Sequence, residues 1–254
     1  GIHCREISMY KFFVEPEQIV EDTVFITGED VNHIVHVLRM KKGEQVLVST
    51  SNDREYLCEI TAFEEEAVQL KLLDVYGSNR ELPIEVTLYQ ALPKGDKMET
   101  VIQKMVELGA VRIVPVVTKR CVVQLDQKKA AKKVARWNAI SEASAKQSKR
   151  NKIPEVMMPM SFAEALFDAK KLEATLIPYE NAEGMEQARC MVDEATKKRS
   201  LGIFIGPEGG FTEQEIEKSQ QNGVKPISLG HRILRTETAG MMLMSVIMFA
   251  TDQD

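Results

Sequence analysis

From Leu82 to the end of the chain, short apolar runs alternate with longer segments in which apolar residues recur every three or four positions. The short runs predict buried strands, and the periodic segments predict helices. We expect strands at residues 85–92, 111–117, 174–178, 201–205 and 226–229. We expect helices at residues 97–108, 126–147, 185–197 and 237–250, and shorter ones that open at the capping-box residues Ser161 and Thr212. Because strands and helices alternate, the pattern predicts a parallel sheet with helices on both of its faces.

The first 75 residues carry a different pattern, because their apolar runs are short, strand-like and bounded by turn residues. We expect strands at residues 10–14, 23–26, 45–50, 56–62 and 67–73. One helix is expected among them, opened by Thr27 and Asp30 at the spacing of a capping box. The sequence therefore predicts a small β-barrel-like domain at residues 9–74, a linker at 75–82 and an α/β domain at 83–254, with Met9 as a candidate natural start.

Basic residues are concentrated in one part of a chain that is acidic as a whole. Residues 119–152 contain eleven basic and two acidic residues, a net charge of +9, whereas the whole chain carries −5 and the remainder therefore −14. An asymmetry of this size favours an anionic partner that binds this one region. The alternative is that the lysines only solvate an exposed helix face.

The end of this basic region mixes cations with amide and hydroxyl side chains, at the point where the predicted helix passes into a loop. Such a mixture suits phosphate groups and base edges better than solvation alone. The residues concerned are Lys146, Gln147, Ser148, Lys149, Arg150, Asn151 and Lys152.

The cysteines Cys4, Cys58, Cys121 and Cys190 form no CxxC pair, which argues against a zinc ribbon and a redox dithiol, and we expect no metal site. Scattered single cysteines are typical of a reducing compartment, so we expect a cytoplasmic protein.

The longest apolar run, residues 239–250, is shorter than the about 20 residues that a membrane-spanning helix needs, so we expect no membrane segment. The first ten residues lack the apolar stretch of a signal peptide.

The loop after the strand at 201–205 contains three glycines in five residues, Gly206, Gly209 and Gly210. Glycine permits positive φ and a close approach of the backbone to a ligand, and Pro207 stiffens the loop. Backbone amides at the start of the next helix can bind an anion or a carbonyl. The loop lacks both the Gly-Lys-Ser/Thr end of a P-loop and a GxGxxG pattern. It indicates a ligand site without a triphosphate-binding lysine or, alternatively, a plain tight turn.

The loop after the strand at 226–229 carries two arginines, Arg232 and Arg235. Two guanidinium groups at a strand exit suit an anionic or oxyanionic group. The alternative is an internal ion pair of Arg235 with Glu208 or Glu237. Candidate caps for the following helix are Thr236 and Thr238. In parallel sheets ligands bind beyond the carboxyl ends of the strands, where both loops are expected.

The sequence combines a small β domain, an α/β domain with two ligand loops and a basic region between them. This combination is typical of an enzyme that acts on a polyanion with a small-molecule cofactor. Two other classes of function stay open. One is an RNA-binding module without catalysis, which has no need of the glycine loops. The other is a nucleotide-dependent α/β enzyme such as a dehydrogenase, against which the missing GxGxxG and Walker A patterns argue.

Six segments of the chain together resemble the RsmE family. Members of that family are uridine N3-methyltransferases of the 16S ribosomal RNA and belong to the SPOUT superfamily. The two segments that carry the signature are 205–211 and 228–239. The supporting segments are 33–39, 91–98, 120–121 and 142–150. The resemblance extends from about Met9 to the C-terminus, and Lys149 stands where the family pattern leads us to expect a glycine.

The resemblance implies a PUA-like N-terminal domain, a SPOUT α/β domain with a deep trefoil knot, a homodimer and S-adenosylmethionine as the methyl donor. The implied cofactor-binding residues are Leu176, Pro178, Ile205, Gly206, Glu208, Gly210, Leu229, Gly230, Ile233 and Leu234. The expected RNA-binding residues are Lys94, Arg120, Lys146, Gln147, Arg150 and Lys152. The implied substrate is 16S ribosomal RNA, within the small ribosomal subunit.

The resemblance also places Arg235 beside the substrate uracil, as the catalytic residue. Loss of the weakly acidic N3 proton leaves negative charge on O2 and O4 of the base, and a guanidinium group there stabilises that charge. In-line transfer from a sulfonium centre depends largely on positioning. Glu208 and Glu237 are the candidates for accepting the proton.

Overall fold

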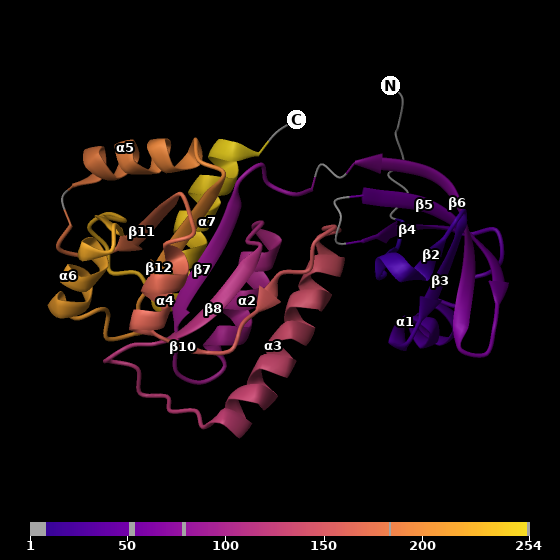
Figure 1. Cartoon of the computed structure of the whole chain (residues 1–254), viewed down its shortest axis with the longest axis horizontal. Coiled ribbons are helices and arrows are strands. Elements are labelled where there is room, and N and C mark those ends of the chain that lie inside the picture. The colour runs from indigo at the N-terminus through magenta and orange to yellow at the C-terminus, as the bar shows by residue number, and fades with distance from the viewer. Residues whose placement is uncertain (1–8, 51–53, 78–79, 183, 253–254) are drawn as a thin grey trace. The chain divides into compact units, whose positions relative to one another are not determined.

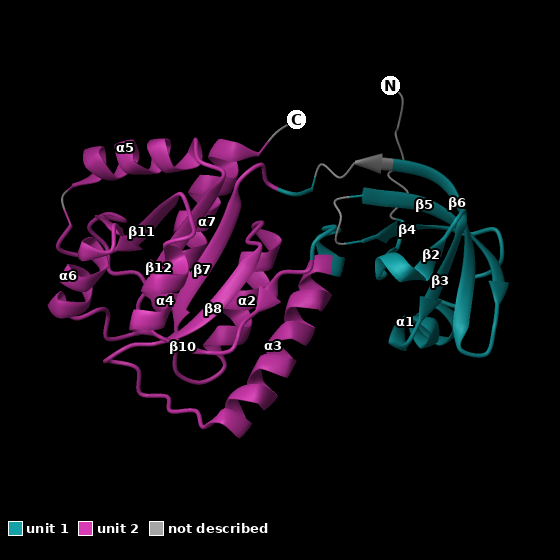
Figure 2. Ribbon diagram, in the orientation of Figure 1, with its two compact units in different colours: residues 1–81, 146–152 teal, residues 82–145, 153–254 magenta. Residues whose placement is uncertain are grey.

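The computed structural model describes residues 9–50, 54–77, 80–182 and 184–252, and the chain divides into two compact units (Figure 2). The first unit comprises residues 1–81 and 146–152, and the second comprises residues 82–145 and 153–254. The division after Glu81 lies inside the linker expected at 75–82. Residues 146–152 group with the first unit, although the helical pattern before them led us to place them in the second domain.

The first unit is built on a curled six-stranded sheet with the order β1-β4-β5-β6-β3-β2 (Figure 1). Its strands are β1 (Lys11–Phe13), β2 (Ile19–Val20), β3 (Thr23–Thr27), β4 (Gln45–Ser49), β5 (Arg54–Phe63) and β6 (Ala67–Gly77). Neighbouring strands are antiparallel except β1 and β4, which are parallel. The small β domain expected from the sequence is confirmed, although β6 extends past the start of the expected linker.

The helix of the first unit begins differently from the expectation. A 3-10 turn at Pro16–Gln18 precedes it along the chain, and α1 spans Glu29–Asn32 and continues as a π-helical turn at His33–Val37. The N-cap of α1 is Gly28, with φ of 73°, and no side chain caps the helix. The capping box expected at Thr27 and Asp30 is therefore wrong, because β3 continues through Thr27 and the left-handed glycine makes the turn into the helix.

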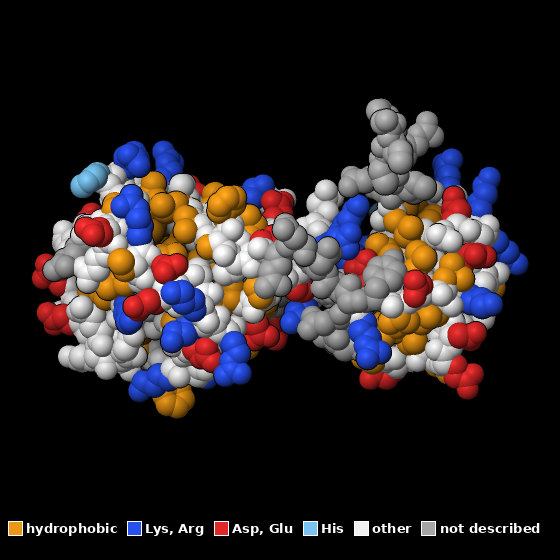
Figure 3. Space-filling model, turned by 90° about the horizontal axis from the view of Figure 1, so that it is seen from above, with side chains coloured by type: hydrophobic (Ala, Val, Ile, Leu, Met, Phe, Trp, Pro, Cys, Tyr) orange, Lys and Arg blue, Asp and Glu red, His pale blue; other side chains and the backbone are white. Residues whose placement is uncertain are grey.

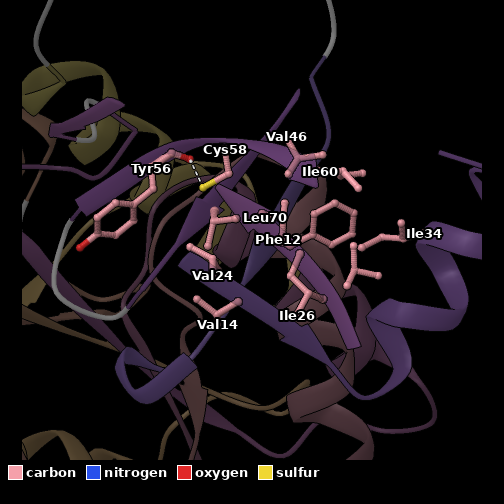
Figure 4. Close-up of a cluster of buried hydrophobic side chains, with 12 residues drawn as sticks. Phe12, Val14, Val24, Ile26, Ile34, Val46, Tyr56, Cys58, Ile60 and Leu70 are labelled. Atoms are coloured by element: carbon pink, nitrogen blue, oxygen red, sulfur yellow. Dashed lines mark hydrogen bonds between the residues drawn. The ribbon is translucent and has the colours of Figure 1, made fainter. Parts of the chain in front are cut away.

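The core of the first unit is one cluster of buried apolar side chains (Figure 4). Val24 and Ile26 of β3 are buried, as are Val68 and Leu70 of β6, because every second residue of a strand points to the same face. Cys58 lies in this cluster, and burial raises the pKa of its thiol to about 12. A thiol held neutral in this way behaves as a small apolar side chain.

The second unit contains the expected parallel sheet, with the order β10-β8-β7-β12-β11-β13 and β9 paired with β8. Its strands are β7 (Glu85–Ala91), β8 (Arg112–Val117), β9 (Glu155–Val156), β10 (Met160–Ser161), β11 (Ala174–Pro178), β12 (Ser200–Ile205) and β13 (Lys225–Ile227). All of the pairings are parallel. The sequence did not predict β9 and β10, because two residues are too few to form a pattern.

Helices cover both faces of this sheet, as the alternation predicts (Figure 1). They are α2 (Lys97–Glu107), α3 (Gln127–Gln147), α4 (Phe162–Ala169), α5 (Met185–Thr196), α6 (Glu213–Gln221) and α7 (Thr236–Thr251). Gly240 brings α7 against Leu88 of β7 and Ile205 of β12. Tyr89 follows Leu88 in β7, and Phe204 precedes Ile205 in β12, so both side chains point to the opposite face of the sheet. There they pack in a cluster with side chains of α4 and α6.

Three of the helix starts expected from the sequence are confirmed. Ser161 and Thr212 each accept a hydrogen bond from the backbone amide three residues later, at 3.2 and 3.1 Å. Asp126 accepts a hydrogen bond from the amide of Lys129 at 2.8 Å and so caps α3. These side chains satisfy amides that have no partner inside the helix.

A buried polar cluster attaches residues 146–152 to the sheet of the first unit. The ammonium group of Lys11 donates to Glu55 Oε2 at 2.7 Å and to Asn151 Oδ1 at 2.5 Å. The side chains of Lys11 and Glu55 are only 1% and 2% exposed. Burial lowers the pKa of Lys11, and the hydrogen bond and charge of Glu55 oppose that effect. This cluster explains why these residues group with the first unit.

Lys149 belongs to the same attachment and adopts φ of 59°, a left-handed conformation. Its backbone carbonyl accepts a hydrogen bond from Lys11 Nζ at 2.5 Å. A left-handed residue at this position accounts for the glycine that the family pattern leads us to expect, because glycine adopts positive φ without strain.

Replacement of Glu55 by leucine is expected to destabilise the first unit by about 3–5 kcal/mol, because the buried ammonium of Lys11 then lacks its counter-charge. Urea unfolding of the purified protein measures this loss. Restoring most of the stability with the double variant Lys11→Met, Glu55→Leu would support the explanation. Asp193→Ala, which removes the exposed pair with Lys197, serves as the control and is expected to change stability by less than about 1 kcal/mol. A Glu55→Leu protein as stable as this control would contradict the prediction.

Candidate functional site

Four neighbouring strands of the second unit end at the same edge of its sheet. Gln90 near the end of β7 pairs with Ile205 at the end of β12, and Pro178 at the end of β11 pairs with Ile227 at the end of β13. Because these strands are parallel, the loops that follow them leave the same carboxyl edge. The glycine loop at 206–211 and the arginine loop at 228–235 are two of these loops, as the sequence predicts.

The glycine loop is tightly folded on itself. The amide of Gly210 donates to the carbonyl of Pro207 at 2.8 Å, and Gly210 has φ of 72°. A Cβ added to Gly206 would lie 3.2 Å from the ring of Phe211, so a side chain at this position would be crowded. A Cβ at Gly210 would meet no atom within 4 Å, so this position requires glycine for its backbone conformation. Space beside Gly210 stays open to a ligand.

Two charged side chains, one from outside the glycine loop and one from within it, attach the loop to its surroundings. Arg120 donates to the carbonyl of Gly209 at 2.7 Å. Glu208 Oε1 accepts from the backbone amide of Lys94 at 2.7 Å and from Lys97 Nζ at 3.1 Å. Partial burial alone would raise the pKa of Glu208, but these hydrogen bonds outweigh it and hold the pKa below its usual value. Glu208 is therefore a charged, structural acceptor.

The hydroxyl of Thr236, at the start of α7, joins the ends of two strands. Thr236 Oγ1 donates to the carbonyl of Gly206 at 2.7 Å and accepts from Gln90 Nε2 at 2.8 Å. Gln90 is fully buried and Thr236 is 5% exposed. One side chain thus fixes the glycine loop, the end of β7 and the first turn of α7 relative to one another.

The arginine loop presents its charges to solvent. Arg232 and Arg235 are exposed, and no ion pair to either appears among the described residues. Glu208 pairs with Lys97 instead. The internal pair of Arg235 with Glu208 or Glu237, which the sequence left open, is thus not formed, and Arg235 is the N-cap residue of α7 without a side-chain cap bond.

Thr236 and Thr238, which we expected to cap α7, are already part of the helix. The hydroxyl of Thr236 instead links Gly206 of the glycine loop to Gln90 of β7. Sequence reasoning missed this role of Thr236 and the whole role of Gln90. The available signal was a glutamine inside an otherwise mostly apolar strand, since a buried amide needs hydrogen-bond partners.

The residues expected to bind a cofactor all lie in β11, β12 and the loops that leave the carboxyl edge. The side chains of Leu176 and Ile205 are buried in the core, so only their backbone groups and the loop beyond them face the edge. Ile233 is 93% exposed. The others are partly buried or exposed loop and strand-end residues, namely Pro178, Gly206, Glu208, Gly210, Leu229, Gly230 and Leu234.

The residues expected to bind RNA have different surroundings. Lys94 has an exposed side chain next to the glycine loop, and Arg120 is bound to that loop. Gln147, the last residue of α3, is exposed, and Lys152 is partly buried.

Two of the cations expected to bind RNA make ion pairs inside the first unit. Lys146 donates to Asp30 at 3.0 Å. Arg150 is 2% exposed and donates to Glu81 at 2.6 Å. Arg150 is therefore engaged in a buried ion pair in this structure, and its contact with RNA stays a prediction.

Two buried polar atoms near the carboxyl edge lack a hydrogen-bond partner within the described residues. They are Gln90 Oε1 and Glu237 Oε2. Buried polar atoms are nearly always hydrogen-bonded, so these two have accepting capacity that no described residue uses.

In the described parts of the chain, no three His, Cys, Asp or Glu side chains lie together as metal ligands would. None of the described helices is long and apolar enough to cross a membrane.

Replacement of Thr236 by valine keeps the shape of the side chain but removes the bridge between the loops. We expect a loss of stability of about 1–3 kcal/mol, because the carbonyl of Gly206 loses its partner. We also expect faster hydrogen exchange at residues 206–211. Urea unfolding and hydrogen-exchange mass spectrometry measure the two effects, and Thr236→Ser should preserve both properties.

Thr251→Val is the matched control, because the buried hydroxyl of Thr251 donates only to the carbonyl of Ile247 in its own helix. It should leave exchange at residues 206–211 unchanged. If both valine variants changed exchange in that loop equally, the bridging role of Thr236 would be refuted.

Comparison with known proteins assigns both units to domain families. Residues 80–248 match the model of the RNA methyltransferase domain, and residues 26–73 match that of the RNA methyltransferase PUA domain. The PUA-like character expected for the first domain is thereby confirmed.

Relatives match over almost the whole chain. A protein of Bacillus subtilis named ribosomal RNA small subunit methyltransferase E is 41% identical, over 96% of this chain and 98% of its own length. A methyltransferase of Legionella pneumophila, solved with its bound cofactor S-adenosylmethionine, has a TM-score of 0.83 at 33% identity, over 96% of this chain and 98% of its own.

A ribosomal RNA small subunit methyltransferase E of Neisseria gonorrhoeae, solved with S-adenosylmethionine, has a TM-score of 0.82 at 31% identity, again over 96% of this chain and 98% of its own. These matches confirm the resemblance carried by the two signature loops. With one domain model matched over residues 80–248 and a relative that is 41% identical along nearly its entire length, the chain belongs to the family of ribosomal RNA small subunit methyltransferase E, the RsmE family.

Proposed function

We propose that this protein transfers a methyl group from S-adenosylmethionine to N3 of a uridine in the 16S ribosomal RNA of the small subunit. The observation that carries the proposal is the pair of signature loops, which leave one sheet edge and are tied together through Thr236. Membership of the RsmE family and the cofactor bound to the Legionella and Neisseria relatives support the choice of reaction and methyl donor.

The carboxyl edge has features that fit S-adenosylmethionine. Gly210 and Gly230 have φ of 72° and 109°, so their backbones have conformations that other residues rarely adopt. The open space beside Gly210 and the unpartnered Gln90 Oε1 are consistent with a ligand that has polar edges. The backbone of 205–210 and of 229–234 would hold the adenine and ribose, with Leu229 and Leu234 as apolar neighbours. When bound, the cofactor supplies an electrophilic methyl group on a sulfonium centre.

Arg235 is the proposed catalytic residue. It is the last residue of the arginine loop and the N-cap of α7, and its guanidinium is exposed and unpaired within the described chain. Removal of the N3 proton of uracil shifts negative charge onto O2 and O4. The planar guanidinium group can donate two hydrogen bonds to such oxygens, which stabilises the charge as it develops.

Of the two candidates for accepting the N3 proton, we propose Glu237. The carboxylate of Glu208 already accepts hydrogen bonds from Lys94 and Lys97, which hold its pKa below the usual value and make it a weaker base. Glu237 lies two residues after Arg235, and its Oε2 is buried without a partner among the described residues. A free carboxylate oxygen has the capacity to accept a proton.

The proposal includes a homodimer, a trefoil knot in the second unit and a cytoplasmic location, which the family resemblance and the cysteine pattern imply. It assigns the PUA-like unit to RNA binding. The match of residues 26–73 to an RNA methyltransferase PUA domain supports this assignment.

A direct test incubates the purified protein with S-adenosylmethionine and small ribosomal subunits from cells that lack the protein. Mass spectrometry of the 16S RNA is expected to show one new 3-methyluridine, and calorimetry should show that S-adenosylmethionine binds the protein. Protein-free 16S RNA, tested in parallel, shows whether the assembled particle is needed. A protein that binds both RNA and particle but methylates neither would be a binding module instead.

Arg235→Ala is expected to slow methyl transfer by roughly 100- to 1000-fold, equivalent to about 2.7–4 kcal/mol for one lost oxyanion donor. Arg235→Lys should be nearly as slow, because lysine keeps the charge but not the planar fork. Melting temperature and S-adenosylmethionine affinity should stay close to those of the wild type. Arg189→Ala, an exposed arginine on α5, is the control. Near-normal methylation by Arg235→Ala, or an unfolded variant, would remove Arg235 from the catalytic role.

A further inference from the structure

The helix α3 has one cationic face along its first ten residues. Its buried side carries small residues and Trp137, which is 4% exposed. Five cations are exposed on the rest of its circumference, at positions i, i+1, i+4, i+5 and i+8. They are Lys128, Lys129, Lys132, Lys133 and Arg136. We call these five residues the α3 basic face, which is about 12 Å long at 1.5 Å per residue.

Few negative charges lie near the α3 basic face: Asp126 caps the helix, and Glu99 and Asp96 act on its C-terminal cations. Residues 127–140 contain five cations and no Asp or Glu. Arg136 pairs with Glu99 of α2, whereas none of the four lysines has an ion pair within the described chain. On the face of the second unit drawn in Figure 3, cationic and anionic side chains are interspersed. A helix face that served only to keep the protein in solution would be expected to mix its charges in the same way.

The arrangement is also unfavourable for the helix itself. Lys128 and Lys129 lie in the first turn of α3, where the helix dipole disfavours cations. Lys128 and Lys132, and likewise Lys129 and Lys133, are like charges four residues apart, and such pairs destabilise a helix. Stability of the isolated protein therefore does not account for these lysines, whereas a polyanion bound to them would remove the repulsion.

The other cations of the basic region are partly engaged within the protein. Lys146 pairs with Asp30, and Arg150 pairs with Glu81. Arg120 donates to the carbonyl of Gly209. The region that appears uniform in the sequence thus divides into cations that hold the structure together and the exposed lysines of α3.

We propose that the α3 basic face binds the phosphate backbone of the RNA substrate, an inference that rests on the proposed function. Lysine ammonium groups bind phosphates as point charges and carry no sequence information. Their expected role is to hold the RNA while the carboxyl edge of the sheet selects the base. This contact is additional to the PUA-like unit and to the expected RNA contacts at residues 146–152.

The composition of the face favours RNA over an acidic protein as the partner. No large apolar side chain of α3 is exposed among the described residues. Protein interfaces usually have aromatic or apolar side chains at their centre. An exposed row of lysines with only alanines between them offers charge alone, which suits a regular polyanion.

The test is RNA binding by the quadruple variant Lys128→Ala, Lys129→Ala, Lys132→Ala, Lys133→Ala. Alanine is the best helix former, so α3 should persist. We expect affinity for a 16S RNA fragment to fall roughly 10- to 100-fold and the slope of log affinity against log salt to become shallower by about 3 units. The corresponding lysine-to-arginine variant should retain both the affinity and the slope.

The matched control removes the same charge elsewhere on the second unit, with Lys170→Ala, Lys197→Ala, Lys198→Ala, Lys218→Ala, all exposed residues. It should lower affinity and slope much less than the α3 variant. Equal effects of the two variants would mean that only net charge matters, and unchanged binding by the α3 variant would mean that the face does not touch RNA. Either result overturns the proposal, as would binding of the wild-type face to polyglutamate but not to RNA.

Binding is measured without S-adenosylmethionine, and methylation is measured separately. A wild-type protein that binds RNA through α3 but methylates no uridine would refute the proposed function and leave this surface in place. A wild-type protein that methylates 16S RNA while the α3 variant binds it normally would refute the surface alone.

Discussion

The hydroxyl of Thr236 is the interaction on which the arrangement of the carboxyl edge depends. A hydroxyl has one donor and two acceptor sites, and here it donates to Gly206 and accepts from Gln90. Since Thr236 begins α7, the same contact determines where Arg235 leaves the preceding loop. The position of the proposed catalytic side chain thus follows from a buried hydrogen bond one residue away.

Electrostatics explains why the basic region of the sequence does not behave as one surface. Buried cations need counter-charges, and Arg150 and Lys11 find them in Glu81 and Glu55. Solvent-exposed lysines are hydrated and need no counter-charge, so the lysines of α3 remain available to bind a partner. The distinction depends on burial, which the charge pattern of a sequence does not contain.

The order and type of the long elements could be predicted, because hydrophobic period and capping residues act locally. Ser161, Thr212 and Asp126 cap the helices expected of them. Thr27 did not, because strand pairing extends to it and Gly28 makes the turn. The two-residue strands β9 and β10 depend on contacts with β8, far away in sequence, and leave no local pattern.

At the site, sequence identified the loops but not what joins them. Glycines and arginines at strand exits can be recognised because their chemistry is unusual at those positions. The bridge between Gln90 and Thr236 spans 146 positions of the chain and arises only when parallel pairing aligns the ends of β7 and β12. A threonine at a helix start is ordinarily interpreted as a cap, so the sequence pointed to a local role where the fold uses a long-range one.

The glycine loop and Arg235 also differ in the part of the residue on which their proposed roles depend. The proposed role of the glycine loop depends on its backbone, whose position is fixed by hydrogen bonds of Arg120, Thr236 and the loop's own Glu208. In the proposed reaction Arg235 acts through its long side chain, and an exposed guanidinium is able to reach an RNA that binds from solvent. A glycine loop held by hydrogen bonds, with an exposed arginine at the end of the neighbouring loop, is consistent with the proposal that a small cofactor binds at the loop and a large RNA binds across it. The internal order of the loop would favour the cofactor, because a preorganised site loses less entropy when its ligand binds.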